Sequence, residues 1–356
     1  MIENPKDMHR KTNVFIRGNR LSLGAEVQPT VPASLNSFPK GAQRNRLGFA
    51  QWIVSKENPL TARTLVNRVW AQLFGRGLVE PLGDMGTQSI PPIHRELLDY
   101  LALDLMNTKK WSVKKLIREM VLSGTYKQSS SLNNSNFEKD PQNYYLARGP
   151  RFRLSAEQIR DQALAVSGLL SNKMYGPSVM PYQPDGVWMT VYSGESWVKS
   201  AGEDQYRRGI YTFLKRTSPY PSFVSFDASS REVCLVDRIR TNTPLQALAT
   251  LNDPVYLEAA KHLGAIMEKE GNGNLRDGIR VGYRQAMLKD ADEKKLKELE
   301  QLYQKALIDF SKKPDSAAKF LNEDLAKSNV KVLPSKAAYM LVANAVLNLD
   351  EFLTKS

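Results

Sequence analysis

Arginine and amide side chains gather in one stretch of the sequence where their chemistry suits an anion. Arg231, Arg238, Arg240 and Asn242 precede a predicted helix start at Thr243. The free N–H groups and the dipole at a helix start attract anions, and guanidinium groups add charge-assisted hydrogen bonds. We therefore predict an anion-binding site here. In the alternative interpretation, the arginines only pair with carboxylates and hold an irregular segment together. These carboxylates would be Glu232, Asp237 and Asp253.

A second candidate site follows one face of a predicted helix. Arg63, Asn67 and Trp70 are spaced four and three residues apart, so they lie at nearly the same angle around a helix. A guanidinium, an amide and an indole in a row can bind a sugar or an acidic group, through bidentate donation and an aromatic platform. The alternative is a second helix-packing face that contains a buried ion pair.

A third candidate site surrounds a turn near the middle of the chain. The sequence Gln-Pro-Asp-Gly at 183–186 is typical of a turn, because proline presets one dihedral and glycine tolerates positive φ. Asp185 and Trp188, with Arg216 further along, are the candidate ligand residues. The aromatic side chains near the turn could line a carbohydrate cleft or, alternatively, bury the loop against helices. They are Tyr182, Trp188, Tyr192 and Trp197.

Catalytic groups are harder to assign from the sequence. A pair of carboxylates could cleave a glycosidic bond, but sequence spacing does not give the distance between them, which decides the stereochemistry. The candidates are Asp161, Asp185, Asp227 and Asp253. The three histidines, His9, His94 and His262, do not form a zinc motif, so we expect no metal and no cofactor. The single cysteine, Cys234, is expected to be a small buried apolar residue.

Helices are predicted to position the residues of the first half. Asn58 followed by proline indicates a helix start, and that helix continues to Phe74 and ends at the glycine after it. The proline pair at 91–92 predicts a helix to about Met106, and Ser112 caps a third one. The Ser- and Asn-rich stretch 129–136 is predicted to be a loop.

The second half combines helices with an irregular middle segment. Ser155 with Gln158, and Thr243 with Gln246, match the capping-box pattern of a helix start. Between them, residues 174–240 are rich in Gly, Pro and aromatic residues and contain a probable strand at 210–214. Apolar residues at 296–310 and after Pro334 have helical spacing and predict an antiparallel helix pair. The expected fold is mainly α, multi-helical and globular, with a small, irregular β-containing middle segment.

Composition and charge suggest a globular chain in four parts. These are an extended arm with a short strand at 13–17 (1–45), a helical subdomain (46–130), the middle segment with its flanking helices (131–270) and a C-terminal helical hairpin (271–356). The formal charge of +13 is concentrated in residues 1–150, with 21 Lys/Arg against 12 Asp/Glu, which favours anionic partners. No apolar run reaches the roughly 18 residues that cross a bilayer, and the start has no apolar signal-peptide stretch.

Many short stretches, spread from about residue 14 to residue 354, resemble one family. They include NPLTAR (58–63), NRVW (67–70), FGRGLV (74–79), HRELLD (94–99), SGTY (123–126), QPDGVW (183–188), YTFLKR (211–216), REVC (231–234), TNTPLQA (241–247), LND (251–253) and LVAN (341–344). The chain is similar to the planctomycete-type C-terminal domain of unknown function that follows a cytochrome c-like domain in exported bacterial proteins.

The resemblance implies a periplasmic or extracellular role in bacteria rich in polysaccharide-degrading systems, and it supplies no catalytic residues. Our first hypothesis is a binding or scaffold module that recognises an anionic polysaccharide or an acidic protein beside an upstream cytochrome c-like domain. The alternative is an extracytoplasmic hydrolase or lyase that acts on polysaccharide with Asp and Arg residues. No helix-turn-helix, RNA-recognition or zinc-finger pattern favours nucleic acid as a partner.

Overall fold

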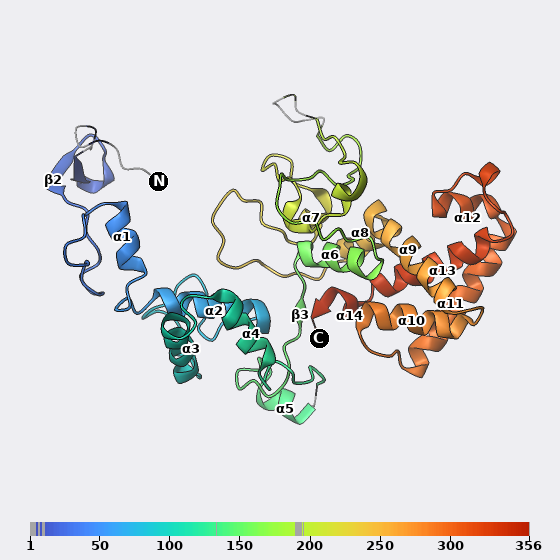
Figure 1. Cartoon of the computed structure of the whole chain (residues 1–356), viewed down its shortest axis with the longest axis horizontal. Coiled ribbons are helices and arrows are strands. Elements are labelled where there is room, and N and C mark those ends of the chain that lie inside the picture. Colours follow the sequence, from blue (N-terminus) through green and yellow to red (C-terminus); the bar gives the residue numbers. More distant parts are fainter. Residues whose placement is uncertain are drawn as a thin grey trace. The chain divides into compact units, whose positions relative to one another are not determined.

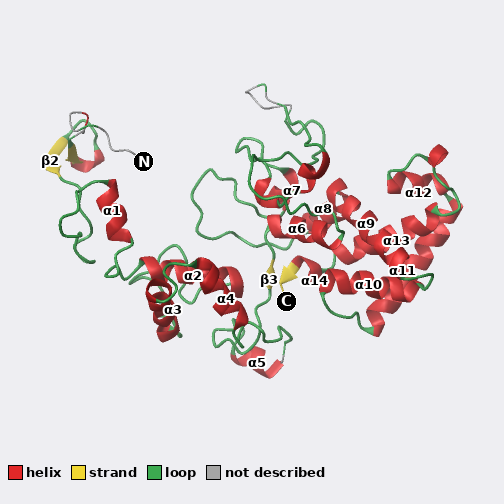
Figure 2. Ribbon diagram, in the orientation of Figure 1, coloured by secondary structure: helices red, strands yellow, loops and turns green. Residues whose placement is uncertain are grey.

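The computed structural model describes residues 5, 8, 11–132, 134–188, 194 and 196–355. The mainly α fold is confirmed: these residues form fourteen α-helices, a few short 3-10 turns and two small antiparallel sheets (Figures 1 and 2). The chain forms two compact units, residues 1–150 and 151–356. Within the described ranges, no helix is both long enough and apolar enough to cross a membrane.

Unit 1 begins with a β-hairpin. Strand β1 (Thr12–Phe15) pairs antiparallel with β2 (Leu23–Val27) across a short 3-10 turn, Ile16–Gly18. The strand predicted at 13–17 is thus confirmed in part: it begins one residue earlier and ends at Phe15, where the 3-10 turn follows. Helix α1 (Arg46–Ile53) follows, and the Asn45 side chain accepts a hydrogen bond from a first-turn N–H group.

The core of unit 1 lies between three helices that the sequence predicts. They are α2 (Thr61–Phe74), α3 (Arg95–Asn107) and α4 (Val113–Leu122). Val66, Leu105 and Leu116, one from each helix, are fully buried. Gly75 ends α2 at φ 84°, a conformation that glycine adopts readily, and Ser112 caps α4 as expected. A short helix, α5 (Asn134–Lys139), begins inside the stretch expected to be a loop.

Unit 2 is built around one buried helix. Helix α13 (Leu333–Leu347) has most of its side chains in the core. It packs against α9 (Pro254–Glu270), where a Cβ atom at Gly264 would meet the backbone nitrogen of Met340 at 2.8 Å. The close approach of these two helices therefore requires glycine. The surrounding helices are α6 (Ala156–Val166), α7 (Pro221–Ser225), α8 (Pro244–Asn252), α10 (Leu275–Met287), α11 (Glu293–Lys312), α12 (Pro314–Leu321) and α14 (Asp350–Leu353).

The predicted antiparallel helix pair is present as α11 and α13. Lys295, near the start of α11, pairs with Glu351 beyond the end of α13, at 2.7 Å. Tyr303, further along α11, lies 3.1 Å from the hydroxyl of Ser335 at the start of α13. Contacts in this order show that the two helices run in opposite directions.

The middle segment contains less strand than expected. At 209–211 the chain forms a 3-10 turn, in which the Thr212 N–H donates to the carbonyl of Gly209. Only a single parallel bridge, between Val179 and Thr212, is present there, so the prediction of a strand at 210–214 is wrong. The sheet of unit 2 instead joins distant segments, β3 (Phe152–Arg153) and β4 (Thr354–Lys355).

Candidate functional site

The arginine-rich segment forms a long exposed loop between α7 and α8, here called the arginine loop (residues 229–243). Figure 1 shows it as the yellow loop that leaves the helices of unit 2. Apolar side chains are exposed along it, and Ile239 has 79% of its surface accessible. Cys234 is exposed as well, so the prediction of a buried cysteine is wrong. The loop leaves the core, and none of the described residues covers the cysteine.

Asp227 anchors the base of the arginine loop. Its Oδ2 atom accepts hydrogen bonds from the Thr241 N–H at 2.8 Å and the Thr241 hydroxyl at 2.7 Å. The same oxygen accepts a third bond, at 3.3 Å, from the buried amide of Gln246. The capping box predicted for Gln246 is absent for this reason: its amide bonds to Asp227, and the Thr243 side chain makes no cap hydrogen bond. The two ends of the loop are thereby joined.

Arg238 closes the loop against α6. Its Nη1 atom donates to both carboxylate oxygens of Glu157, at 2.8 and 3.0 Å. Burial alone would raise the pKa of Glu157, but the hydrogen bonds and charge of Arg238, together with hydrogen bonds from the Glu157 backbone and Ser155, hold that pKa below its usual value. The internal carboxylate is therefore Glu157, which the sequence did not suggest. Asp253, one of the predicted partners, caps α9 by accepting from the Val255 N–H.

Arg240 lies over an aromatic ring of the small sheet. Its guanidinium carbon is 4.5 Å from the centre of the Phe152 ring, and the Lys355 ammonium is 5.9 Å from the same ring. Burial lowers the pKa of both side chains, Arg240 and Lys355. The Phe152 ring thus contacts two cationic side chains.

Arg151 and Arg153 bring two more cations to this sheet, and both bind one carboxylate. Arg151 donates to Oδ2 of Asp350 at 3.1 Å, and Arg153 donates to Oδ1 at 3.3 Å. The Nε atom of Arg153 is buried and has no hydrogen-bond partner. Burial lowers the pKa of Arg153, against the opposing effects of Asp350 and Asp227. Sequence reasoning missed this group because no local pattern predicts a contact between positions 153 and 350.

The other predicted residues around the loop stay exposed. The Arg231 side chain has no hydrogen bond, ion pair or ring contact within the described part of the chain, and its backbone has φ 62°. Asn242 and Arg216 are likewise exposed at the surface of unit 2. Arg231 and Asn242 both belong to the arginine loop, and both are exposed, so a ligand can reach their donors from solvent.

The aromatic residues near the turn at 183–186 pack together. Trp188 is buried and lies edge-on to Trp197, with 5.3 Å between ring centres, and the Lys215 ammonium is 4.8 Å from its ring. Trp197 in turn stacks on Tyr220. Asp185 is exposed at the turn. Tyr182 is partly exposed, and the predicted residue Tyr192 lies outside the described residues.

The row on α2 makes internal contacts throughout. Arg63 donates to Asp99 at 2.6 Å, and this bond, with the charge of Arg63, holds the Asp99 pKa below its usual value despite burial. The buried Asn67 side chain donates to the carbonyl of Val79 at 2.8 Å and accepts from its N–H group at 3.0 Å. Trp70 is buried in a stack with a neighbouring phenylalanine. These contacts are those of a packing face.

A family model described as PSD1, "Protein of unknown function (DUF1553)", matches residues 45–303. The chain belongs to the PSD1 family. No curated protein and no solved structure matches it. The PSD1 match includes α2, β3 and the whole arginine loop, whereas the N-terminal hairpin, Asp350 and Lys355 lie outside it.

Three of the four aspartates considered for catalysis in this PSD1 chain have internal partners. Asp161 accepts from Arg208 and from the Gly209 N–H, and Asp227 and Asp253 make the contacts given above. Burial raises the pKa of Asp253. Among the described residues, no group of three or more His, Cys, Asp and Glu side chains could hold a metal ion. Of the histidines, His94 contacts a backbone carbonyl, His262 is exposed, and His9 lies outside the described residues.

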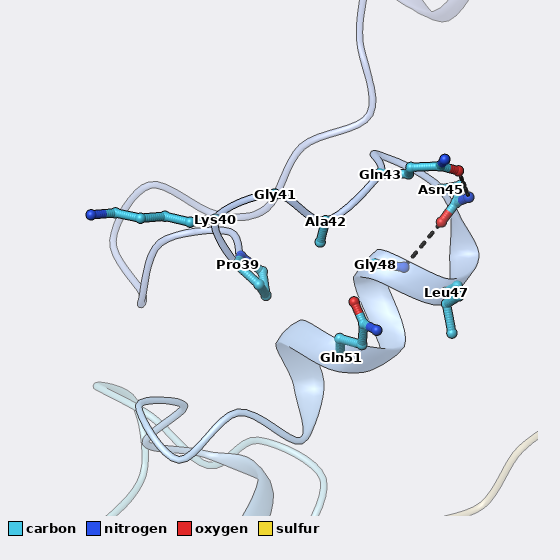
Figure 3. A pocket seen from close by; sticks show the side chains of 9 residues that line it. All are labelled: Pro39, Lys40, Gly41, Ala42, Gln43, Asn45, Leu47, Gly48 and Gln51. Carbon is cyan, nitrogen blue, oxygen red and sulfur yellow. Dashed lines mark hydrogen bonds between the residues drawn. The ribbon is translucent and has the colours of Figure 1, made fainter.

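An open pocket of about 360 Å³ lies in unit 1 beside the start of α1 (Figure 3). Its wall depends on Gly48, where a Cβ atom would meet the carbonyl oxygen of Gln43 at 2.0 Å. The Asn45 amide bonds to Gln43 and to the Gly48 N–H group, and the Lys40 side chain extends away from the hollow. No candidate residue from the sequence lines it. The lining residues are Pro39, Lys40, Gly41, Ala42, Gln43, Asn45, Leu47, Gly48 and Gln51.

Proposed function

We propose that this PSD1 chain is a binding or scaffold module that recognises an anionic ligand through the arginine loop. One observation carries the proposal: the loop is fixed at its base by Asp227 and along its length by the Arg238–Glu157 pair, yet it exposes Arg231. A positioned loop loses little conformational freedom when it binds, so its exposed donors contribute more to affinity. The positive formal charge of the chain would attract such a ligand.

The ligand in this proposal is an anionic polysaccharide or an acidic protein. Resemblance of the sequence to domains of exported bacterial proteins supports an extracytoplasmic setting beside a cytochrome c-like domain, which we include in the proposal. The hydrolase or lyase alternative has weaker support, because Asp161, Asp227 and Asp253 are engaged in internal hydrogen bonds. Within the described residues, only the exposed Asp185 of that set lacks a partner.

Retention on gels that carry sulfated or uronic polysaccharides, or an immobilised acidic protein, tests the proposal. Replacing Arg231 with alanine (Arg231→Ala) should weaken binding about tenfold, the equivalent of one charge-assisted hydrogen bond, and lower the salt concentration at elution. The matched control is Arg118→Ala on α4, which removes the same charge from another exposed site without a partner in the described residues.

The two variants separate loop recognition from general charge attraction. A loss confined to Arg231→Ala supports the loop as the binding surface. Equal losses in both variants would show that net charge alone causes retention. Absence of retention of the unmodified chain on every gel at low salt would also reject the proposal.

A further inference from the structure

Helix α8 buries polar side chains and exposes leucines. Gln246 and Thr250, four residues apart, are buried, whereas Leu245, Leu248 and Leu251 are exposed. At 3.6 residues per turn, these leucines lie on the side of the helix opposite the buried pair. A surface helix usually turns its apolar side toward the core, so α8 has the reverse arrangement. The three leucines are here called the leucine face.

Polar contacts hold α8 in this orientation. The Gln246 amide donates to Oδ2 of Asp227 at 3.3 Å. The Thr250 hydroxyl bonds to the side chain of Asn348, and the Thr250 carbonyl accepts from the buried amide of Asn344 on α13 at 3.1 Å. Rotation of the leucine face toward the core would break these bonds and leave buried polar groups without partners. The leucines therefore stay on the surface of unit 2.

The exposed apolar area around α8 suits a weak contact with another molecule. Helix α7 packs against α8 and exposes a further apolar residue, Val224. A leucine or valine side chain covers roughly 60–120 Å² when it is fully buried, so four half-exposed side chains offer on the order of 200 Å². Grouped apolar residues on a surface mark interaction sites more often than scattered ones do. An area of this size is typical of a reversible interface rather than a permanent one.

The charge of this segment favours a second copy of the chain as the occupant. Residues 241–252 contain no charged side chain, although the chain has a formal charge of +13. The charged residues on either side are engaged, since Arg240 lies over the Phe152 ring and Asp253 caps α9. The leucine face offers no cation to an acidic protein and no aromatic platform to a sugar. Two basic chains can meet there without opposing the like charges that keep them apart elsewhere.

We infer that the leucine face joins two copies of this chain in a weak, reversible dimer. Leu248 is the central residue, with Leu245 three positions before it and Leu251 three positions after it. The spacing is the same in both directions, so an antiparallel copy places Leu248 against Leu248 and Leu245 against Leu251. A two-fold contact requires such a self-complementary surface. The inference goes beyond the proposed function, because a dimer carries two arginine loops and can hold one polymeric ligand at two points.

Sedimentation equilibrium of the full chain over a range of concentrations tests the dimer. Reducing conditions prevent an intermolecular disulfide through the exposed Cys234. The average mass should rise from the 40.1 kDa of one chain toward twice that value, with a dissociation constant on the order of 10–100 μM. Added salt should not weaken the dimer, since the contact is apolar and salt screens the repulsion between the two chains.

Leu248→Gln should weaken the dimer by more than about tenfold, because a two-fold contact carries each substitution twice. The matched control is Leu103→Gln on α3, since Leu103 and Leu248 are both 55% exposed. Neither side chain is part of a core, so both variants should fold, and the control should dimerise as the unmodified chain does.

Two results would overturn the inference. One is a mass that stays at that of a single chain up to about 200 μM, and the other is equal dimerisation of Leu248→Gln and Leu103→Gln. If Leu248→Gln instead lowered retention of a monomeric chain on the polysaccharide or acidic-protein gels, the leucine face would bind that ligand rather than a second copy. Arg231→Ala separates the two proposals, because it should lower retention on the gels and leave the dimer unchanged. A monomeric chain that is still retained leaves the loop proposal standing.

Discussion

The α2 row and the arginine loop contain similar side chains and use them differently. On α2, Arg63 and Asn67 make hydrogen bonds to the carboxylate of Asp99 and the backbone of Val79. In the arginine loop, Arg238 has an internal partner, whereas Arg231 has none in the described part of unit 2. Equal donor chemistry therefore gives a packing face in one region and an exposed surface in the other.

The difference follows from the number of neighbouring elements around each region. The side chains of a helix in a small bundle point in several directions, and where a second face contacts other elements, its hydrogen-bond donors meet acceptors there. A loop that leaves the core meets fewer elements, so a cationic side chain such as that of Arg231 can stay in solvent. Candidate ligand residues on a central helix should therefore be discounted more than those on a projecting loop.

Loss of the Asn67 amide should have the largest effect on stability. Asn67→Ala leaves the buried N–H and carbonyl of Val79 without partners, and each unsatisfied group costs about 1–3 kcal/mol. We expect the free energy of unfolding of unit 1 to fall by roughly 3 kcal/mol, measured by denaturant unfolding. Arg68→Ala, one position along the same helix but exposed, should change it by less than about 0.5 kcal/mol. Equal values for the two variants would show that the α2 row is not a packing face.

Removal of Arg238 should have an intermediate effect that depends on pH. Arg238→Ala leaves the carboxylate of Glu157 partly buried without its partner, and we expect a loss of about 1–2 kcal/mol at pH 7, since the pair is partly exposed to solvent. The pair holds the Glu157 pKa below its usual value in the folded state. Its stabilisation is therefore fully present above the pKa of the unfolded chain and lost as pH falls through the lowered pKa.

The variant should depend less on pH over the same range. Without Arg238, Glu157 loses the largest influences that lower its pKa, while burial and the hydrogen bonds with its own backbone and with Ser155 remain, so its carboxylate stabilises the fold less at neutral pH. The stability difference between the two proteins should therefore shrink as pH falls from 7 to 4, as measured by denaturant unfolding at each pH. Glu157→Gln removes the titrating group and is the control, because Arg238→Ala in that background should have an effect independent of pH. If the difference in unfolding free energy between the unmodified protein and Arg238→Ala did not change with pH while Glu157 is present, the result would argue against the pair.

Local patterns predicted most of the fold and little of the candidate site. Ser112 and the Ser155–Gln158 capping box act as the sequence indicated, because a cap depends on residues within one helical turn. The second capping box failed because Gln246 bonds to Asp227, a partner from outside that turn. The predicted strand at 210–214 also failed, because the neighbouring segment pairs with it through a single bridge, between Val179 and Thr212.

The site depends on contacts that sequence spacing does not encode. Arg238 was recognised as a candidate, but its partner Glu157 lies 81 positions away. Asp350 pairs with Arg151 and Arg153, which lie 199 and 197 positions away, and no sequence motif predicts these pairs. Residue type therefore indicated which side chains matter for the loop, and only the structure shows which of them are neutralised.

The smallest effect on stability is expected at an exposed apolar residue of the arginine loop. Ile239 is 79% exposed, so Ile239→Ala removes little packing and should change the free energy of unfolding by less than about 0.5 kcal/mol. The same substitution at the buried Ile159 of α6 should cost roughly 3 kcal/mol. Denaturant unfolding of both variants measures the contrast directly. If Ile239→Ala cost more than about 1 kcal/mol, the loop would be packed against the protein in solution, and its contrast with the α2 row would disappear.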